Sequence, residues 1–105
     1  MKIIYRDKTQ DINTNYQVLC IDELVRLTSF ISWEYEAYNR IAITASNSKK
    51  EAFAKCGIIQ AELKEYAYFG ADCNKNQALY LSLFGNASWK DVYKILSDIE
   101  RIELD

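Results

Sequence analysis

The segment from Asp22 to Ala45 constrains the fold of this chain more than any other stretch. Apolar residues recur in it three and four positions apart, which is the spacing of one helix face. This first line consists of Leu24, Leu27, Ile31, Tyr35, Tyr38 and Ala42. A second line with the same spacing consists of Phe30, Trp33, Ala37 and Ile41. The pattern predicts a central helix over residues 22–44 that is buried on two sides or leaves one side for a partner.

Length and composition favour a single helical domain over residues 1–105. A chain of 105 residues is long enough for one compact domain and too short for two. It contains no proline and three glycines, and such a composition suits helices joined by short polar connections. The fold is therefore predicted to be mainly α, with three to four helices.

A second helix is predicted over residues 48–68, after a polar break. Gly70 suits the position just past the end of this helix. Gly57 lies inside it, and either the close approach of another helix or a break in the helix would explain a glycine there. The expected core stripe consists of Ala52, Cys56, Ile59, Leu63 and Tyr66.

The C-terminal third contains the clearest helix signal, over residues 88–103. Ser88 and Asp91 have the spacing of a capping box, in which each residue satisfies a free backbone N–H group of the first turn. The apolar run 78–84 before it fits either a helix closed by Gly85 or a buried strand, because periodicity does not separate the two in so short a run.

The N-terminal third leaves two interpretations open. Residues Lys2 to Tyr5 indicate a short strand or an apolar arm laid on the core. Residues Tyr16 to Ile21 fit a strand that pairs with it, which would make the fold α+β with a short N-terminal hairpin. Thr14 and Gln17 also have the form of a capping box, which would instead start a helix at Asn15. We favour the strand, because it leaves Asp22 as the N-cap or first-turn acid of the central helix.

Charge and hydropathy limit the partners and the compartment. The net charge of −2 and the pI of about 5.2 argue against a nucleic-acid-binding role, which usually requires a basic face. No apolar run is long enough for a signal peptide or a membrane span. The sequence therefore predicts a cytoplasmic protein with no membrane contact.

Catalytic chemistry has little support in this sequence. There is no histidine, which excludes Ser-His-Asp and Cys-His arrangements, and the three glycines are too far apart for a phosphate-binding loop. Cys20, Cys56 and Cys73 are odd in number and contain no CxxC pair, so we expect neither disulfides nor a metal site. The chain is predicted to have no cofactor and not to be an enzyme, with a histidine-free enzyme as the remote alternative.

The aromatic residues are the best candidates for a binding surface, since Tyr and Trp are enriched at interface hot spots. On a helical projection Trp33 points away from the first apolar line and toward charged residues. Two interpretations remain open, because Trp33 could be an exposed anchor or could be covered by another element. In the first case Glu36 would select a basic partner. The candidate protein-binding residues are Phe30, Trp33, Glu34, Glu36 and Arg40.

Compact size and the absence of catalytic motifs favour a small binding protein that acts by occupying another protein. Immunity proteins, antitoxins and phage-type inhibitors are of this kind. A regulatory or structural homodimer with the Trp33 line buried against its twin is the alternative. The partner is expected to be another protein, and a basic one fits the acidic residues of the central segment.

Overall fold

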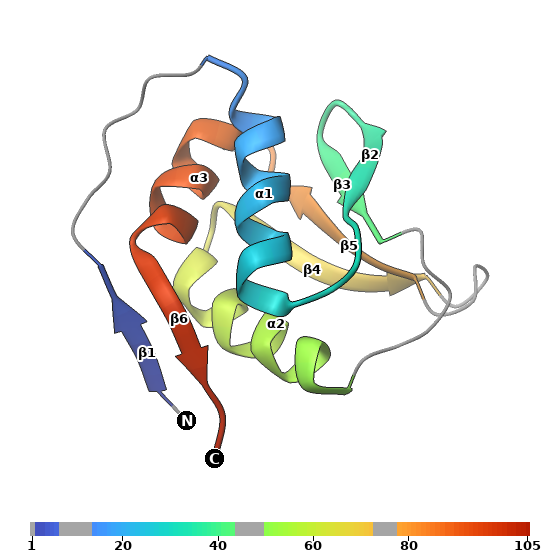
Figure 1. Ribbon diagram of the computed structural model, residues 1–105. Coiled ribbons are helices and arrows are strands. Elements are labelled where there is room, and N and C mark those ends of the chain that lie inside the picture. The colour runs from blue at the N-terminus through green and yellow to red at the C-terminus, as the bar shows by residue number, and fades with distance from the viewer. Residues whose placement is uncertain (1, 7–13, 44–49, 73–77) are drawn as a thin grey trace.

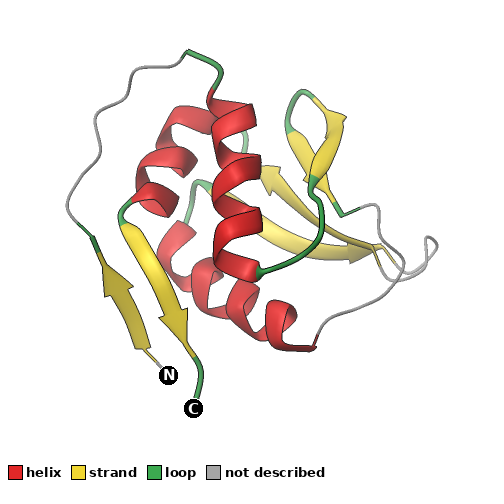
Figure 2. Cartoon of the chain, viewed as in Figure 1, coloured by secondary structure: helices red, strands yellow, loops and turns green. Residues whose placement is uncertain are grey.

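The structure, a computed structural model, describes residues 2–6, 14–43, 50–72 and 78–105. Within these residues three helices and six strands form an α+β fold with two antiparallel sheets (Figures 1 and 2). The prediction of a mainly α fold is therefore wrong. The alternative added only a short N-terminal hairpin, and that hairpin does not exist, because β1 pairs with the C-terminal strand β6 and residues 16–21 are helical.

The elements alternate along the chain. The helices are α1 (Tyr16–Thr28), α2 (Lys50–Leu63) and α3 (Trp89–Ser97). The strands are β1 (Lys2–Tyr5), β2 (Glu34–Ala37), β3 (Arg40–Ala42), β4 (Ala67–Asp72), β5 (Ala78–Leu83) and β6 (Ile99–Glu103). Strands β2-β3-β5-β4 form, in that order, what we call the larger sheet, and β1 and β6 form the smaller sheet.

The predicted central helix over residues 22–44 does not exist as one element. Helix α1 starts earlier, at Tyr16, so the favoured strand over residues 16–21 is wrong and the helical alternative is correct. Its N-cap is Asn15 and not Thr14, and the Asn15 side chain accepts a hydrogen bond from the Val18 N–H group. It ends where Ser29 adopts a left-handed conformation (φ 61°) and donates its N–H to the Val25 carbonyl. The chain then turns back as the β2–β3 hairpin.

Helix α2 runs through Gly57 without a break and ends at Leu63, so the predicted extension to residue 68 is wrong. The start predicted at residue 48 lies outside the described residues. A Cβ atom placed on Gly57 meets no atom within 4 Å, which also rules out the close approach of another described element at this position. Gly57 therefore lies exposed in the middle of the helix, and no other described residue packs on it.

Gly57→Ala is expected to stabilise the protein by about 0.5–1 kcal/mol, because alanine removes backbone freedom from the unfolded chain and fits the helix without strain. Urea unfolding measures this change. Ala54→Gly, at another exposed position of α2, is the matched control and should destabilise by a similar amount. A lower stability for Gly57→Ala would mean that something in solution packs closely on this surface.

The capping box of the last helix is confirmed. Ser88 accepts a hydrogen bond from the Asp91 N–H group, and the Asp91 carboxylate accepts one from the Ser88 N–H group. The helix is shorter than predicted, because residues 99–103 form β6 instead of its last turns. The apolar run 78–84 corresponds to strand β5, and Gly70 lies within strand β4 instead of closing a helix.

The predicted strand at Lys2 to Tyr5 is confirmed as β1, but its partner is the C-terminal strand β6 and not residues 16–21. Ile3 lies opposite Ile102 and Ile4 lies opposite Arg101. The two ends of the chain therefore lie side by side in the smaller sheet (Figure 1).

The hydrophobic core lies between the helices and one face of the larger sheet. In Figure 1 helix α1 lies in front of the larger sheet, and α2 runs below β4, against which it packs. The largest side chains that are fully buried come from all three helices, the larger sheet and β6: Leu24, Ile41, Ile59, Leu63, Leu81, Val92, Leu96 and Ile99. No helix in the described part of the chain is long and apolar enough to cross a membrane.

Candidate functional site

The larger sheet has a second face, which we call the outer face, on the side away from the helices. Ile41 and Leu81, which lie opposite each other in β3 and β5, are fully buried in the core. Because successive side chains in a strand point to opposite sides, their neighbours Arg40 and Ser82 lie on the outer face. The same alternation and the strand register place Glu34, Ala42, Tyr68, Gly70, Tyr80 and Phe84 there.

An aromatic pair stands on this outer face. Tyr68 lies opposite Ser82, and Phe84 is therefore its diagonal neighbour across β4 and β5. The two ring centroids are 4.7 Å apart, yet Tyr68 remains 36% exposed and Phe84 43% exposed. Solvated faces of antiparallel sheets are normally polar, so two large exposed rings in contact are the kind of patch that marks a binding surface.

A second cluster on the outer face holds an arginine in a fixed position. The Tyr80 ring lies across Gly70, since a Cβ atom on that glycine would approach the ring to 2.6 Å. The Arg40 guanidinium carbon lies 4.8 Å from the centroid of the same ring, and its Nε atom lies 2.7 Å from Glu36 Oε2. Stacking on an aromatic ring and pairing with a carboxylate orient the guanidinium before any partner arrives.

The structure separates the five predicted site residues into two groups. Phe30 and Trp33 are core residues, each 2% exposed, so the buried interpretation of Trp33 is the one observed. The Trp33 indole N–H donates to Thr28 Oγ1 at 3.1 Å, and its ring packs on Phe30 and Phe69. Neither Phe30 nor Trp33 can contact a partner in the folded state, which corrects the predicted anchor role of Trp33.

The other three predicted residues lie together on the larger sheet. Glu34 is exposed on β2, opposite Ala42. Glu36 sits where the register of β2 shifts and forms the ion pair with Arg40. Because the Glu36 carboxylate already pairs with Arg40, Glu34 is the better placed of the two acids to meet a basic partner. Their role in binding stays a prediction.

The β2–β3 hairpin at the edge of this sheet is held by other elements. The Gln17 side chain of α1 donates to the Ala37 carbonyl at 3.0 Å, and the Trp89 indole of α3 donates to the Tyr38 carbonyl at 2.7 Å. Tyr38 is nevertheless 86% exposed. Two helices therefore fix the position of a hairpin whose own tyrosine faces solvent, which lowers the entropy cost of binding there.

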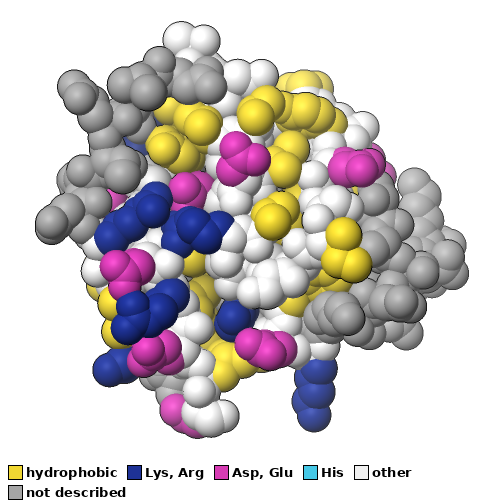
Figure 3. Space-filling view, in the orientation of Figure 1, with side chains coloured by type: hydrophobic (Ala, Val, Ile, Leu, Met, Phe, Trp, Pro, Cys, Tyr) yellow, Lys and Arg dark blue, Asp and Glu magenta, His cyan; other side chains and the backbone are white. Residues whose placement is uncertain are grey.

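Charged residues are distributed unevenly over the molecule. Figure 3 shows the helix-bearing side, where most Lys and Arg side chains gather over β1 and β6 with Asp and Glu side chains between them. On the outer face of β2, β3, β4 and β5 the described charged side chains are Glu34, Glu36 and Arg40. This face therefore combines aromatic surface with a slight excess of negative charge.

Tyr68, Tyr80 and Phe84 are the site residues that sequence reasoning missed. Their signal was present, because Leu79, Leu81 and Leu83 alternate with Tyr80, Ser82 and Phe84 across residues 79–84. Alternation of period two indicates a strand with a buried face and a second, more aromatic face. Because residues 78–84 fitted either a helix or a strand, the sequence did not predict which face of the protein would carry Tyr80 and Phe84.

The described cysteines are not suited to nucleophilic chemistry. Cys20 and Cys56 are buried and unpaired. Burial raises the pKa of the Cys56 thiol to about 12 and raises that of Cys20 well above its usual range. Both thiols are therefore protonated at neutral pH. Cys73 lies outside the described residues, and the described residues contain no cluster of acids and thiols that could hold a metal ion.

Comparisons of the chain with protein-family models, with characterised proteins and with solved structures found no match. What supports a function for this chain is therefore the geometry of its own surface.

Proposed function

We propose that this chain is a small protein-binding module that acts by occupying a partner protein, and that the outer face of the larger sheet is its contact surface. The observation that carries the proposal is the exposed Tyr68–Phe84 pair. Tyr and Arg are enriched at interface hot spots, and here they lie beside one another as Tyr68, Tyr80 and Arg40. The face is built on paired strands, so little conformational freedom is lost when it binds.

The partner in this proposal carries positive charge opposite Glu34. Arg40 is already paired with Glu36, which leaves Glu34 to attract a Lys or Arg side chain at the edge of the contact. Buried, unpaired thiols at Cys20 and Cys56 fit a reducing compartment, and we place the protein in the cytoplasm on this ground. A protein that inhibits or neutralises its partner by binding to it and covering its surface needs no catalytic group.

The test replaces Tyr68 and Phe84 by threonine, which removes each ring and retains a residue that favours strands. We expect both variants to fold as the native chain does and to bind the partner at least about tenfold more weakly, which corresponds to about 1.4 kcal/mol for each ring. The partner is the protein that co-purifies from the native host, and isothermal titration of the two purified proteins measures the affinity.

Tyr5→Thr is the matched control, because Tyr5 is also an exposed strand tyrosine but lies in the smaller sheet. It should bind the partner with native affinity. Equal affinities for all three variants would place the contact elsewhere and refute the proposal. If the native chain is a dimer by light scattering and Tyr68→Thr makes it a monomer, the occupant of this face is a second copy and the homodimer alternative holds.

A further inference from the structure

The larger sheet ends in two edge strands, β4 and β2 (Figure 1). An edge strand carries N–H and C=O groups that have no neighbouring strand, and proteins usually protect such an edge. At β4, the Gln60 side chain of α2 accepts a hydrogen bond from the Phe69 N–H group at 2.6 Å and donates one to the Ala67 carbonyl at 3.0 Å. One amide side chain thus covers the first half of the β4 edge.

Strand β2 has a backbone position that faces outward and is not covered in this way. The Ile43 N–H group, just past β3, donates to the Leu79 carbonyl on the β5 side. Because backbone groups alternate in direction along a strand, Ala42 directs its own groups toward β2, where it lies opposite Glu34. The next residue of β2, Tyr35, therefore points its N–H and C=O groups away from β3. Within the described residues these two groups have no hydrogen-bond partner.

Apolar side chains are exposed beside this edge. All four residues of β2 are exposed. Tyr35 lies opposite the buried Ile41, so its ring stands on the helix-bearing side of the sheet, where it is 52% exposed. Tyr35, Ile31 and Tyr38 make up half of the six large apolar side chains that are exposed in the described part of the chain. The edge therefore offers apolar surface, with Tyr35 at its centre.

The other face of β2 carries an acid without a cation. Glu34 lies on the outer face and forms no ion pair within the described residues. The described cation of this face, Arg40, already pairs with Glu36. A strand added at this edge therefore meets an apolar ring on one face and an uncompensated carboxylate on the other.

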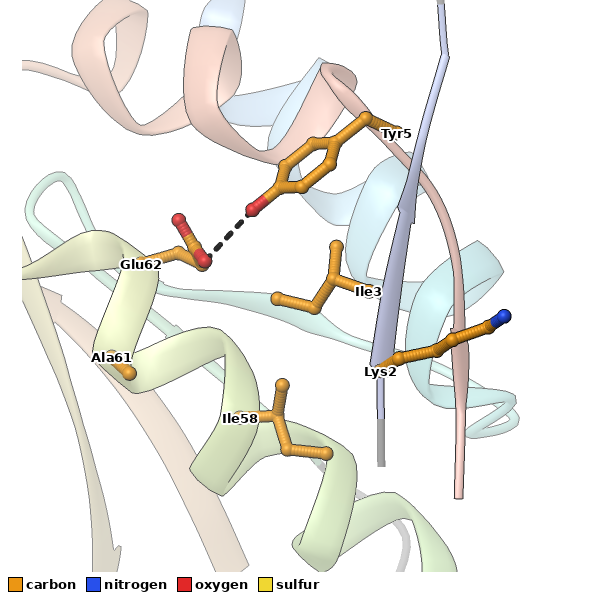
Figure 4. Close-up of a pocket in the computed structure, with 6 residues that line it drawn as sticks. All are labelled: Lys2, Ile3, Tyr5, Ile58, Ala61 and Glu62. Carbon is orange, nitrogen blue, oxygen red and sulfur yellow. Dashed lines mark hydrogen bonds between the residues drawn. The ribbon is translucent and has the colours of Figure 1, made fainter. Parts of the chain in front are cut away.

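The edge of β1, in the smaller sheet, shows no such preference. A hollow of about 470 Å³ lies between β1 and α2. Figure 4 shows the hydrogen bond from the Tyr5 hydroxyl to Glu62 (2.9 Å) at one end of it. Lys2 also lines this hollow and pairs with Glu103. The hollow thus contains charges of both signs that already have partners, so it favours no one class of segment.

We propose that β2 accepts an extended, basic segment of the partner protein as a fifth strand of the larger sheet. The inference rests on the proposed function for its partner, and the added strand continues the outer face beyond β2. The segment exchanges backbone hydrogen bonds with Tyr35. Its residue opposite Tyr35 is apolar, and its residue opposite Glu34 is Lys or Arg. The shift of register near Glu36 limits this pairing to a few residues, so it adds to the contact on the outer face.

The acids of β2 decide between such a segment and a second copy of this chain. Ala37 lies opposite Arg40 and directs its backbone groups toward β3. Two copies of β2 can therefore pair antiparallel within the strand only with Tyr35 opposite Tyr35. Glu34 of each copy would then lie opposite Glu36 of the other, and like charges in direct opposition destabilise a strand pair. A basic segment brings the opposite charge to Glu34, so we assign the edge to it.

The probe is the pentapeptide Lys-Val-Lys-Val-Lys, blocked at both ends and titrated into the full chain. We expect it to shift the backbone amide resonances of Glu34, Tyr35 and Glu36 in nuclear magnetic resonance spectra. The same peptide with glutamate in place of lysine should bind at least about fivefold more weakly, because it brings like charge to Glu34. A version with N-methylated valines, which lacks the donors that face β2, should bind at least about tenfold more weakly.

Two variants separate the backbone contribution from the charge. Tyr35→Pro removes the outward N–H group and should abolish the shifts at Glu34 and Glu36, since an edge strand tolerates proline where the N–H group faces solvent. Glu34→Lys should reverse the preference, so that the glutamate peptide binds more tightly than the lysine peptide. Glu65→Lys, at an exposed position just past α2, is the matched control and should leave the preference unchanged. If Tyr35→Pro fails to fold, the N-methylated peptide tests the same hydrogen bonds on the native chain.

The proposal is overturned if the lysine peptide causes no shifts at β2, if N-methylation leaves its affinity unchanged, or if the chain alone dimerises through β2. Each of these results leaves the outer face untouched, because Tyr68→Thr and Phe84→Thr test that face with the co-purifying partner and should leave peptide binding unchanged. If both ring variants bind the partner with native affinity while the lysine peptide still shifts Tyr35, the proposed outer-face contact fails and the strand-accepting edge is supported.

Discussion

Trp33→Ala is expected to lower the free energy of unfolding by about 3–5 kcal/mol, the largest effect of any substitution considered for this chain. The indole is 2% exposed and fills the space between Phe30 and Phe69. Alanine would leave a cavity there and would remove the hydrogen bond to Thr28, whose hydroxyl is also buried. A domain of this size has about 5–15 kcal/mol of stability, so the variant should be close to unfolding at 37 °C.

Guanidinium unfolding followed by circular dichroism measures this effect, with Trp33→Phe as the control. Phenylalanine keeps most of the ring volume and loses the indole N–H, so it should cost only about 1–2 kcal/mol. A loss below about 1 kcal/mol for Trp33→Ala would show that the indole is not packed in the core. The central segment would then remain open as a binding surface.

Glu23→Ala is expected to cost about 2–3 kcal/mol, because Glu23 joins two arginines at the junction of α1, α3 and the smaller sheet. Its carboxylate pairs with Arg6 at 3.1 Å and with Arg26. Arg6 in turn donates to the Ser97 carbonyl, and Arg26 donates to the Ile99 carbonyl. Without the carboxylate, two partly buried positive charges would lie close together and uncompensated.

Urea unfolding at low and high salt measures this contribution, and Glu103→Ala is the matched control. Glu103 also pairs with two cations, Lys2 and Arg101. The side chains of Glu103, Lys2 and Arg101 are all well exposed, so Glu103→Ala should lower the free energy of unfolding by less than about 1 kcal/mol. Equal losses for the two variants would contradict the structural role of the Glu23 cluster. Glu23→Gln should fall between Glu23→Ala and the native chain, since an amide keeps one acceptor and loses the charge.

The sequence allowed correct prediction of elements that have local signals. Strand β1 follows from its apolar run, and the start of α3 follows from the capping box of Ser88 and Asp91. The wrong predictions concern where helices end. Ser29 ends α1 in a left-handed conformation that usually calls for glycine, and the hairpin turn at Tyr38 and Asn39 contains neither glycine nor proline. Without these residues the local signal for a chain reversal is weak, and Asn39 is the one turn-favouring residue here.

Periodicity also predicts a helix beyond Thr28 where the chain forms none. Tyr35 and Tyr38 continue the helical spacing of Leu24 and Leu27, yet both tyrosines are exposed on the hairpin. Tertiary pairing of β3 with β5 determines the conformation of this segment, and a pairing partner some forty residues away has no local signature. For the same reason the outer face could not be assembled from sequence, since its members come from β2, β3, β4, β5 and the residue after β5.

The measurement that tests the proposed binding face most directly is hydroxyl-radical footprinting of the chain alone and in complex with its co-purifying partner. Oxidation of exposed aromatic side chains is read by mass spectrometry, residue by residue. Binding through the outer face predicts that Tyr68 and Phe84 lose reactivity in the complex while Tyr5 keeps it. Unchanged reactivity at Tyr68 and Phe84, with protection at other exposed side chains instead, would contradict the assignment of the outer face.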